Sequence, residues 1–263
     1  MKVDFYKYHG TGNDFIIIDN RDGAFSKNNT NARKQLCDRR FGIGADGLIL
    51  LEADKFSDFA MVYYNSDGNE STMCGNGGRC IVSFAKRLGL IGSTTTFNAI
   101  DGSHSATIDE EGLVRLQMND VENISISKRH VFLDTGSPHH VEYLDDIESV
   151  NVKVKGSEIR YSGLYGKAGS NVNFVRQDDT EIFSIRTYER GVEDETLSCG
   201  TGAVAVAIAS HALGKTNSEK IHINVEGGEL EVSFTNANGT YRNVYLSGPA
   251  EFVYKGMIDI SKW

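Results

Sequence analysis

Short runs in which apolar and polar residues alternate make up most of this chain. A period of two predicts strands with one buried face, and turn signals such as Asp67-Gly68 and Glu111-Gly112 between the runs are typical of antiparallel pairing. In the first part of the chain the predicted strands are 3–8, 15–18, 48–51, 59–65, 94–99, 105–108 and 113–118. After a polar stretch near 119–128 they are 131–133, 140–143, 172–176, 182–188, 221–225, 230–234 and 244–246.

Three helical runs interrupt this pattern. The run 32–40 is ordinary, whereas 79–88 is apolar over most of its surface and 202–213 is apolar almost all round. A helix without a polar face is a buried helix. We therefore expect strands wrapped around one central helix in each of two halves, with a boundary near 119–128 and an internal pseudo-duplication.

Composition narrows the class of protein. The 263 residues are 40% hydrophobic, enough for one large domain or two ordinary ones. A formal net charge of −9 without a basic stripe argues against nucleic acid as a partner. The N-terminus has no apolar signal core and no run approaches the ~20 residues that span a bilayer, so we expect a cytoplasmic protein without a membrane partner. Four cysteines then indicate reduced thiols.

Each of the two apolar helices follows a cysteine in a glycine turn. The first turn reads Cys74-Gly75-Asn76-Gly77 and the second reads Cys199-Gly200-Thr201-Gly202. Backbone N–H groups and the helix dipole favour negative charge at such a position, and they can lower a thiol pKa from ~8.5 to roughly 3.5–7.5. One such cysteine would be read as an inert core residue. Two in matched turns indicate acid/base groups that act on one substrate.

The chemistry that suits this pair of cysteines is inversion of the configuration at a substrate carbon. One thiolate removes a proton from one face and the other thiol delivers a proton to the opposite face. A substrate carboxylate set against both helix N-termini would accept N–H bonds that also stabilise the charge formed when the α-proton leaves. This reaction requires no cofactor, and we expect none.

Other sites that the residues suggest are weaker. Gly42-Ile43-Gly44-Ala45-Asp46-Gly47 has the letters of a dinucleotide fingerprint, but a helix precedes it and a strand follows, the reverse of the required order. Cys74 and Cys80 are six residues apart without a Cys-x-x-Cys or paired-histidine motif, which disfavours zinc, and we expect no metal. His104 is expected to face solvent.

Five motifs occur in order along nearly the whole chain. They are the run from His9 to Phe15, the run from Asp38 to Gly47, the Cys74 turn, Gly136-Ser137-Pro138-His139, and the segment from Glu189 to Gly202. In content and order they closely resemble the diaminopimelate epimerase family. The resemblance implies a cofactor-independent epimerase that interconverts LL- and meso-2,6-diaminopimelate, on the route to lysine and peptidoglycan.

The resemblance also implies a fold. It is an α+β fold with two pseudo-symmetric halves, each a mostly antiparallel strand barrel around a central buried helix. The first half would span 1–120, with a C-terminal strand at about 251–263 packed back on it, and the second half 121–250. The active site would lie in the cleft between the halves, and the protein would be a homodimer.

Roles for individual residues follow from the same resemblance. Cys74 and Cys199 would be the opposed acid/base groups, with His139 near the first and Glu189 near the second. Backbone N–H groups of the two turns would hold the reacting carboxylate. The substrate-binding set that the family pattern implies is Asn13, Asn65, Gly75, Asn76, Asn171, Glu189, Arg190, Gly200 and Thr201.

Two groups of alternatives remain. A proline racemase or hydroxyproline epimerase shares the two-cysteine logic but has no use for a distal carboxylate site such as Arg190. A phenazine-biosynthesis isomerase typically lacks the first cysteine, and a non-catalytic amino-acid-binding protein of this fold could lose a thiol. The chain departs from the family pattern at Gly47, where many members have Gln, at Ser137, and in a loop before Cys199 that is one residue longer.

Overall fold

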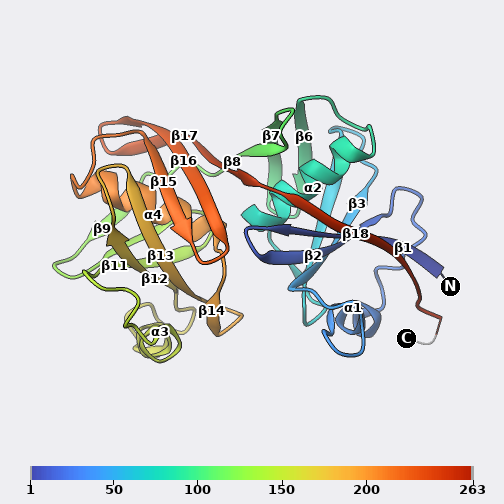
Figure 1. Ribbon diagram of the computed structural model, residues 1–263, viewed down its shortest axis with the longest axis horizontal. Helices are drawn as coiled ribbons and strands as arrows, with labels where there is room; N and C mark the ends of the chain where they lie inside the picture. Colours follow the sequence, from blue (N-terminus) through green and yellow to red (C-terminus); the bar gives the residue numbers. More distant parts are fainter. Residues whose placement is uncertain (1, 262–263) are drawn as a thin grey trace. The chain divides into compact units, whose positions relative to one another are not determined.

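The computed structural model describes residues 2–261, in which the chain divides into two compact units (Figure 1). The first unit comprises residues up to 116 together with those from 249 onward, and the second unit comprises residues 117–248. Each unit has its own strands, its own buried helix and its own apolar core.

The first unit is built from nine strands and two helices within the described residues. Its elements are β1 (Lys2–Gly10), β2 (Asn13–Asp19), α1 (Thr30–Cys37), β3 (Gly47–Glu52), β4 (Phe59–Asn65), β5 (Glu70–Ser71), α2 (Gly75–Arg87), β6 (Thr94–Ala99), β7 (Gly102–Ile108), β8 (Leu113–Gln117) and β18 (Glu251–Asp259). The last strand, β18, pairs antiparallel with β1 and lies beside it in Figure 1.

The second unit has nine strands and two helices within the same described range. Its elements are β9 (Ile124–Ile126), β10 (Val131–Asp134), β11 (Pro138–Tyr143), α3 (Val152–Tyr161), β12 (Asn171–Gln177), β13 (Ile182–Glu189), β14 (Asp194–Thr196), α4 (Gly200–Ala212), β15 (Lys220–Val225), β16 (Gly228–Ala237) and β17 (Thr240–Pro249).

The two units repeat the same pairing scheme. In the first, β18, β1 and β2 pair antiparallel in turn, β2 pairs parallel with β3, and β3 pairs antiparallel with β4. Strand β4 pairs antiparallel with β5 and parallel with β6, and β6, β7 and β8 continue antiparallel. Strands β9 to β17 make the same series of pairings in the second unit. The expected α+β fold with pseudo-symmetric halves is therefore confirmed.

The helices that follow the two cysteines are buried, as their apolar sequences predict. Helix α2 contacts strands β1 to β4, β7 and β18, and α4 contacts β10 to β13, β15 and β16. In Figure 1 each of these helices lies among the strands of its own unit. Ten of the thirteen residues of α4 are buried. Each helix begins directly after its cysteine, α2 at Gly75 and α4 at Gly200.

The two other helices depart from the sequence predictions. Helix α1 ends at Cys37 rather than continuing to residue 40, because Asp38 is extended and its carboxylate accepts the N–H groups of Arg40 and Phe41. Helix α3 was not predicted. Asn151 caps it by accepting from Val154 N–H at 3.1 Å, and its apolar side packs on the core of the second unit.

The expectation that His104 faces solvent is wrong. Its side chain is only 9% exposed, lies 3.2 Å from Asp101, and stacks on the ring of Phe97. The aromatic neighbour on β6 gives the ring a partner that the local polar sequence does not reveal. Among residues 2–261, no helix is long and apolar enough to cross a membrane.

Candidate active site

Cys74 and Cys199 occupy the same structural position in the two units. Each is the extended N-cap residue immediately before its buried helix, α2 or α4. The first intrahelical bonds are donated by Gly78 to Cys74 O at 2.7 Å and by Ala203 to Cys199 O at 2.9 Å. The N–H groups of the preceding helical residues therefore point out of the N-terminus, where they can bind an anion.

A tight hairpin turn brings Asn13 to Cys74. Thr11 and Gly12 both have positive φ, 48° and 85°, and Gly10 pairs with Asn13 across the turn. Positive φ at both central residues defines a type I′ turn, which costs energy at a β-branched threonine. Asn13 Oδ1 lies 3.7 Å from Cys74 Sγ and accepts from Asn76 Nδ2 at 3.1 Å.

A cluster of charges holds Asn13 in place. Asn13 Nδ2 donates to Asp46 at 2.7 Å, and Arg39 bridges Asp46 to Asp14 with bonds of 2.7 Å to each. Lys7 donates to Asp14 at 2.6 Å. Burial alone would raise the pKa of Asp14, but hydrogen bonds from Arg39 and Lys7 outweigh it and lower that pKa to about 2. Asp14 is therefore ionised at neutral pH.

Arg79 lies beneath the first turn of α2 and is fully buried. Its guanidinium donates three long bonds of 3.4 Å, to Gly75 O, Thr11 Oγ1 and Pro249 O. Burial lowers its pKa, and the nearby Cys80 and Cys74 oppose that shift. A buried cation at this position favours anions at the helix N-terminus.

Asn65 and Gly47 form a corner at the same end of the first unit. They pair across β3 and β4, and Asn65 is exposed. A Cβ at Gly47 would lie 2.5 Å from the ring of Tyr63 and 2.8 Å from Tyr64 O. The departure from the family pattern at Gly47 thus has a structural reason, because the Tyr63 ring fills the space of a side chain.

In the second unit, His139 and Thr201 lie against Cys199. His139 is fully buried, and its Nε2 lies 2.9 Å from Thr201 Oγ1, which in turn lies 3.6 Å from Cys199 Sγ. Thr201 is fixed through its carbonyl, which accepts from Thr135 Oγ1 at 2.9 Å. The resemblance implied that His139 lies near the first cysteine; within its own unit, the structure links His139 through one hydroxyl to the second cysteine, Cys199.

Two residues that the sequence analysis did not select support His139. Asn173 Nδ2 lies 3.1 Å from His139 Nδ1, and Asn173 Oδ1 accepts from Thr187 Oγ1 at 3.0 Å. All three side chains are at most 2% exposed. Burial, assisted by the charge of Arg190, lowers the pKa of His139 to about 3, so this imidazole is neutral at ordinary pH. The signal was present in Asn171-Val172-Asn173, which places two amides on one face of a buried strand.

Asn171 joins three segments at the same end of the second unit. Its Nδ2 donates to Ser137 Oγ at 2.8 Å and to Pro138 O at 3.1 Å, and its Oδ1 accepts from the backbone N–H of Arg190 at 2.8 Å. Ser137 is therefore a partner of Asn171. Arg190 also donates to Ala168 O at 3.4 Å.

Glu189 lies at the end of β13, where its Oε2 accepts from Thr196 Oγ1 at 3.0 Å. The longer loop that follows is ordered by Glu193, which has a positive φ of 60°. The Glu193 carboxylate accepts from Tyr188 Oη at 2.9 Å and from Gly191 N–H at 3.1 Å. The extra residue is thus accommodated within the β13–β14 hairpin.

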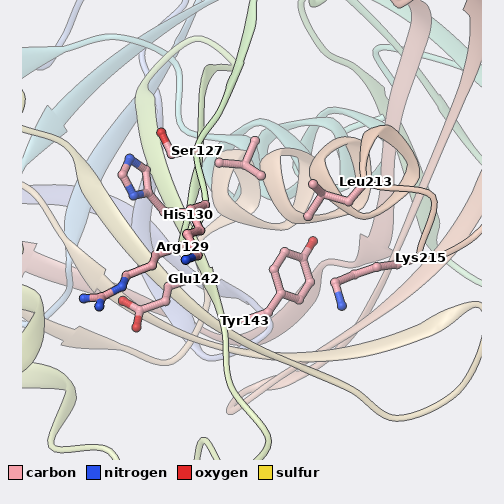
Figure 2. Close-up of a pocket in the computed structure, with 9 residues that line it drawn as sticks. Ser127, Arg129, His130, Glu142, Tyr143, Leu213 and Lys215 are labelled. Atoms are coloured by element: carbon pink, nitrogen blue, oxygen red, sulfur yellow. The ribbon is translucent and has the colours of Figure 1, made fainter.

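A pocket of about 390 Å³, whose lining residues are drawn in Figure 2, lies next to the C-terminal end of α4. Lys215 and Leu213, which follow the helix, line it together with Glu142 and Tyr143 of β11. The thirteen residues of α4 span about 20 Å at 1.5 Å each, so this pocket is separate from the cysteine. Among residues 2–261, no group of three or more His, Cys, Asp or Glu side chains is arranged to hold a metal ion.

Comparison with known proteins identifies the family. The diaminopimelate epimerase family model matches residues 5–124 and 131–253. The chain belongs to the diaminopimelate epimerase family. The diaminopimelate epimerase of Flavobacterium psychrophilum is 64% identical over 253 residues, which cover 96% of this chain and 99% of that protein. The diaminopimelate epimerase of Chlorobaculum tepidum is 45% identical over 95% of this chain and 99% of its own length.

Membership confirms the resemblance and places the chain among the isomerases, in the racemase and epimerase class, with a function in lysine biosynthesis. A Bacillus anthracis phenazine biosynthesis protein of the PhzF family has the same fold, with a TM-score of 0.78 at 13% identity. That comparison covers 99% of this chain and all of the other. At this identity the likeness concerns the fold alone, because function depends on the site.

Proposed function

We propose that this chain interconverts LL- and meso-diaminopimelate by proton transfer between the substrate α-carbon and two cysteines. The observation that supports this most strongly is the matched placement of Cys74 and Cys199 in a diaminopimelate epimerase family member. One sulfur removes the α-proton as a thiolate and the other supplies a proton to the opposite face as a thiol. Their roles exchange when the reaction runs in the other direction.

The reacting carboxylate is bound by the N–H groups of Gly75, Asn76, Gly200 and Thr201. These groups lie in the first turns of α2 and α4, where backbone donors and helix dipoles favour an anion. The same donors stabilise the additional negative charge that develops on the carboxylate as the proton leaves. The step therefore requires neither a metal nor a cofactor.

The distal amino-acid end of the substrate is bound by Arg190 and by Asn13, Asn65 and Asn171. Arg190 supplies a bidentate fork for the distal carboxylate, and the asparagine side chains supply both donors and acceptors. Glu189 binds the distal ammonium or takes part in proton movement near Cys199. His139 acts through Thr201, to which it is hydrogen bonded.

The setting of the enzyme is part of the proposal. A small-molecule substrate of a biosynthetic pathway fits a cytoplasmic enzyme with reduced thiols, and the acidic net charge of −9 disfavours nucleic acid as a partner. We propose a homodimer by resemblance to the family. Sedimentation of the purified protein tests that state directly.

Conversion of LL-diaminopimelate to the meso isomer, followed by chiral chromatography with proline as a parallel substrate, tests this function. We expect conversion of diaminopimelate and none of proline. Cys74→Ala and Cys199→Ala should each abolish inversion while the circular dichroism spectrum is retained. Cys80→Ala is the matched control, because Cys80 is fully buried and its pKa is raised by burial. Binding without conversion would leave a non-catalytic binding protein, and inversion by the Cys74→Ala, Cys199→Ala double variant would exclude the mechanism.

A further inference from the structure

The directions of the hydrogen bonds around His139 can be worked out from the partners of Asn173. A backbone carbonyl only accepts, so the end of the Asn173 amide that lies 3.0 Å from His140 O is its NH2 group. The other end then accepts from the Thr187 hydroxyl at 3.0 Å. One N–H of Asn173 is used by His140 O, and the second points at His139 Nδ1 at 3.1 Å.

This arrangement fixes the tautomer of His139. Because Nδ1 accepts a bond, the neutral imidazole carries its proton on Nε2. Nε2–H then donates to Thr201 Oγ1 at 2.9 Å. Asn171 does not compete for Nε2, because its two N–H groups point to closer acceptors, at 2.8 Å and 3.1 Å, while Nε2 is 3.4 Å away. The Thr201 hydroxyl is left to donate its own proton toward Cys199 Sγ at 3.6 Å.

We infer that Asn173 is a positioning residue that holds His139 in the Nε2–H tautomer, so that Thr201 donates to Cys199 and the resting enzyme carries its thiolate there. The inference rests on the proposed function for its catalytic meaning. In this arrangement His139 donates to Thr201 in a series of hydrogen bonds that ends at Cys199 Sγ. His139 is therefore not the base that takes the proton of the Cys199 thiol.

The first unit provides an internal comparison. Phe15 pairs with Gly47 as His139 pairs with Asn171, and Ile49 pairs with Tyr63 as Asn173 pairs with Thr187. Positions occupied by His139, Asn173 and Thr187 are therefore occupied by Phe15, Ile49 and Tyr63 behind Cys74. The fold accommodates apolar and aromatic side chains at these positions, so the buried polar chain behind Cys199 is not a requirement of the architecture.

At Cys74 the bond runs in the other direction. Asp46 can only accept from Asn13, so the Asn13 amide turns its Oδ1 toward Cys74, which donates S–H to it at 3.7 Å. In the first unit Arg79 is the buried cation near Cys74, whereas in the second unit Arg190 is the cation whose charge acts on His139. None of the residues bonded to Cys74 is changed in the variants below, so Cys74 serves as the internal reference for Cys199.

Two measurements test the inference without relying on turnover. Nitrogen chemical shifts of ¹⁵N-histidine-labelled protein report the His139 tautomer. The pH dependence of iodoacetamide alkylation, mapped by mass spectrometry, reports the thiolate at Cys199 and at Cys74 separately. Asn173→Asp is nearly isosteric but has no N–H to donate, so Nδ1 should become protonated and Nε2 should accept from Thr201. Thr201→Val removes the hydroxyl, Thr201→Ser retains it, and Thr187→Val is the control that leaves both N–H groups of Asn173 in place.

We expect the wild-type protein to have the Nε2–H tautomer, and Asn173→Asp to have Nδ1–H. Loss of one bond to a charged sulfur, roughly 1.5–3 kcal/mol, corresponds to about a 10- to 150-fold lower thiolate population at Cys199 below its pKa. Asn173→Asp and Thr201→Val should show this change at Cys199 and not at Cys74, whereas Thr201→Ser and Thr187→Val should not.

An Nδ1–H tautomer of His139 in the wild-type protein overturns the inference. A folded Asn173→Asp variant in which both the His139 tautomer and the alkylation profile of Cys199 are unchanged also overturns it. If Asn173→Asp does not fold, Thr201→Val decides, because a half-buried threonine replaced by valine keeps its shape. If the protein fails to epimerise diaminopimelate while these shifts occur, the proposed function fails and the positioning role stands.

Discussion

Replacing Gly202 by alanine is the substitution for which the structure makes the sharpest forecast. Gly202 is the third residue of α4, and a Cβ there would lie 2.6 Å from Asn173 Oδ1 and 3.3 Å from Cys199 Sγ. Gly77 is the equivalent residue of α2. A Cβ at Gly77 would meet the flexible ends of Ile49 at 3.1 Å and Met61 at 3.3 Å, and it would make an ordinary contact of 3.5 Å with the ring of Phe15.

Two effects of opposite sign decide the outcome. Alanine in place of a helical glycine gains about 1 kcal/mol, whereas overpacking a filled core costs about 1–3 kcal/mol. The Asn173 amide cannot retreat, because Thr187, His139 and His140 O hold it with bonds of 3.0–3.1 Å, each of which contributes about 1 kcal/mol. We therefore expect Gly202→Ala to lose about 1–2 kcal/mol of stability and at least tenfold in kcat. Gly77→Ala should remain within about 1 kcal/mol of the wild type.

Urea unfolding gives the free energies, and conversion of LL-diaminopimelate gives kcat and KM for both variants. The loss in Gly202→Ala should fall on kcat more than on KM, because the contact affects Cys199 and its support. Equal stability and equal kcat in Gly202→Ala and Gly77→Ala would refute the reasoning, since the two sites differ only in what the new methyl group meets.

Three further substitutions test separate parts of the structure. Asp14→Asn should destabilise the protein by about 2 kcal/mol at neutral pH, because the pKa of Asp14 is lower in the folded protein, at about 2, than in the unfolded chain. The ionised carboxylate stabilises the folded state at any pH above the unfolded-state pKa. In urea unfolding, the difference in stability between wild type and Asp14→Asn should therefore disappear as the pH falls from 4 to 2. Wild-type stability should fall as the pH is lowered from 6.5 to 3, because the pKa of His139 is about 3 in the folded protein and the unfolded chain binds the proton at a higher pH. In His139→Gln the free energy of unfolding should change less steeply with pH over this range. An equal slope in the two proteins would contradict the lowered pKa of His139. Gly47→Ala should lose about 1–3 kcal/mol in thermal or urea unfolding, because its methyl group would collide with Tyr63 and Tyr64 O, and a neutral result would mean that the ring moves freely.

The strands and buried helices could be predicted from the sequence because their periodicity is local. Alternation marks a half-buried strand, and the apolar run of α4 marks a core helix wherever it lies in the chain. Helix α3 could not be predicted in the same way, because Gly156 lowers its helix propensity. The structure explains that glycine, since a Cβ there would lie 2.6 Å from Tyr188 Cγ, a partner 32 positions away.

The site residues likewise differ in how far the local sequence reveals them. Cys74 and Cys199 were evident because each lies beside its own glycine turn and helix, which are features of contiguous sequence. Asn173 was not evident, because its role depends on a register that places it opposite Thr187 and beside His139. The pair Asn171 and Asn173 marks two amides on one face of a buried strand, but it does not reveal which side chains those amides meet or which tautomer of His139 Asn173 fixes.

The direct test of the two-cysteine mechanism is the position of the isotope early in the reaction. LL-diaminopimelate is incubated with the enzyme in deuterated water, and both the meso product and the recovered LL substrate are analysed for α-deuterium before equilibrium is approached. Two opposed cysteines predict deuterium at the inverted carbon of the product and almost none in recovered substrate, because the sulfur that removes a proton is not the one that delivers the next. Deuterium entering the LL substrate as fast as the meso product would mean that one exchanging group serves both faces, and would contradict the mechanism.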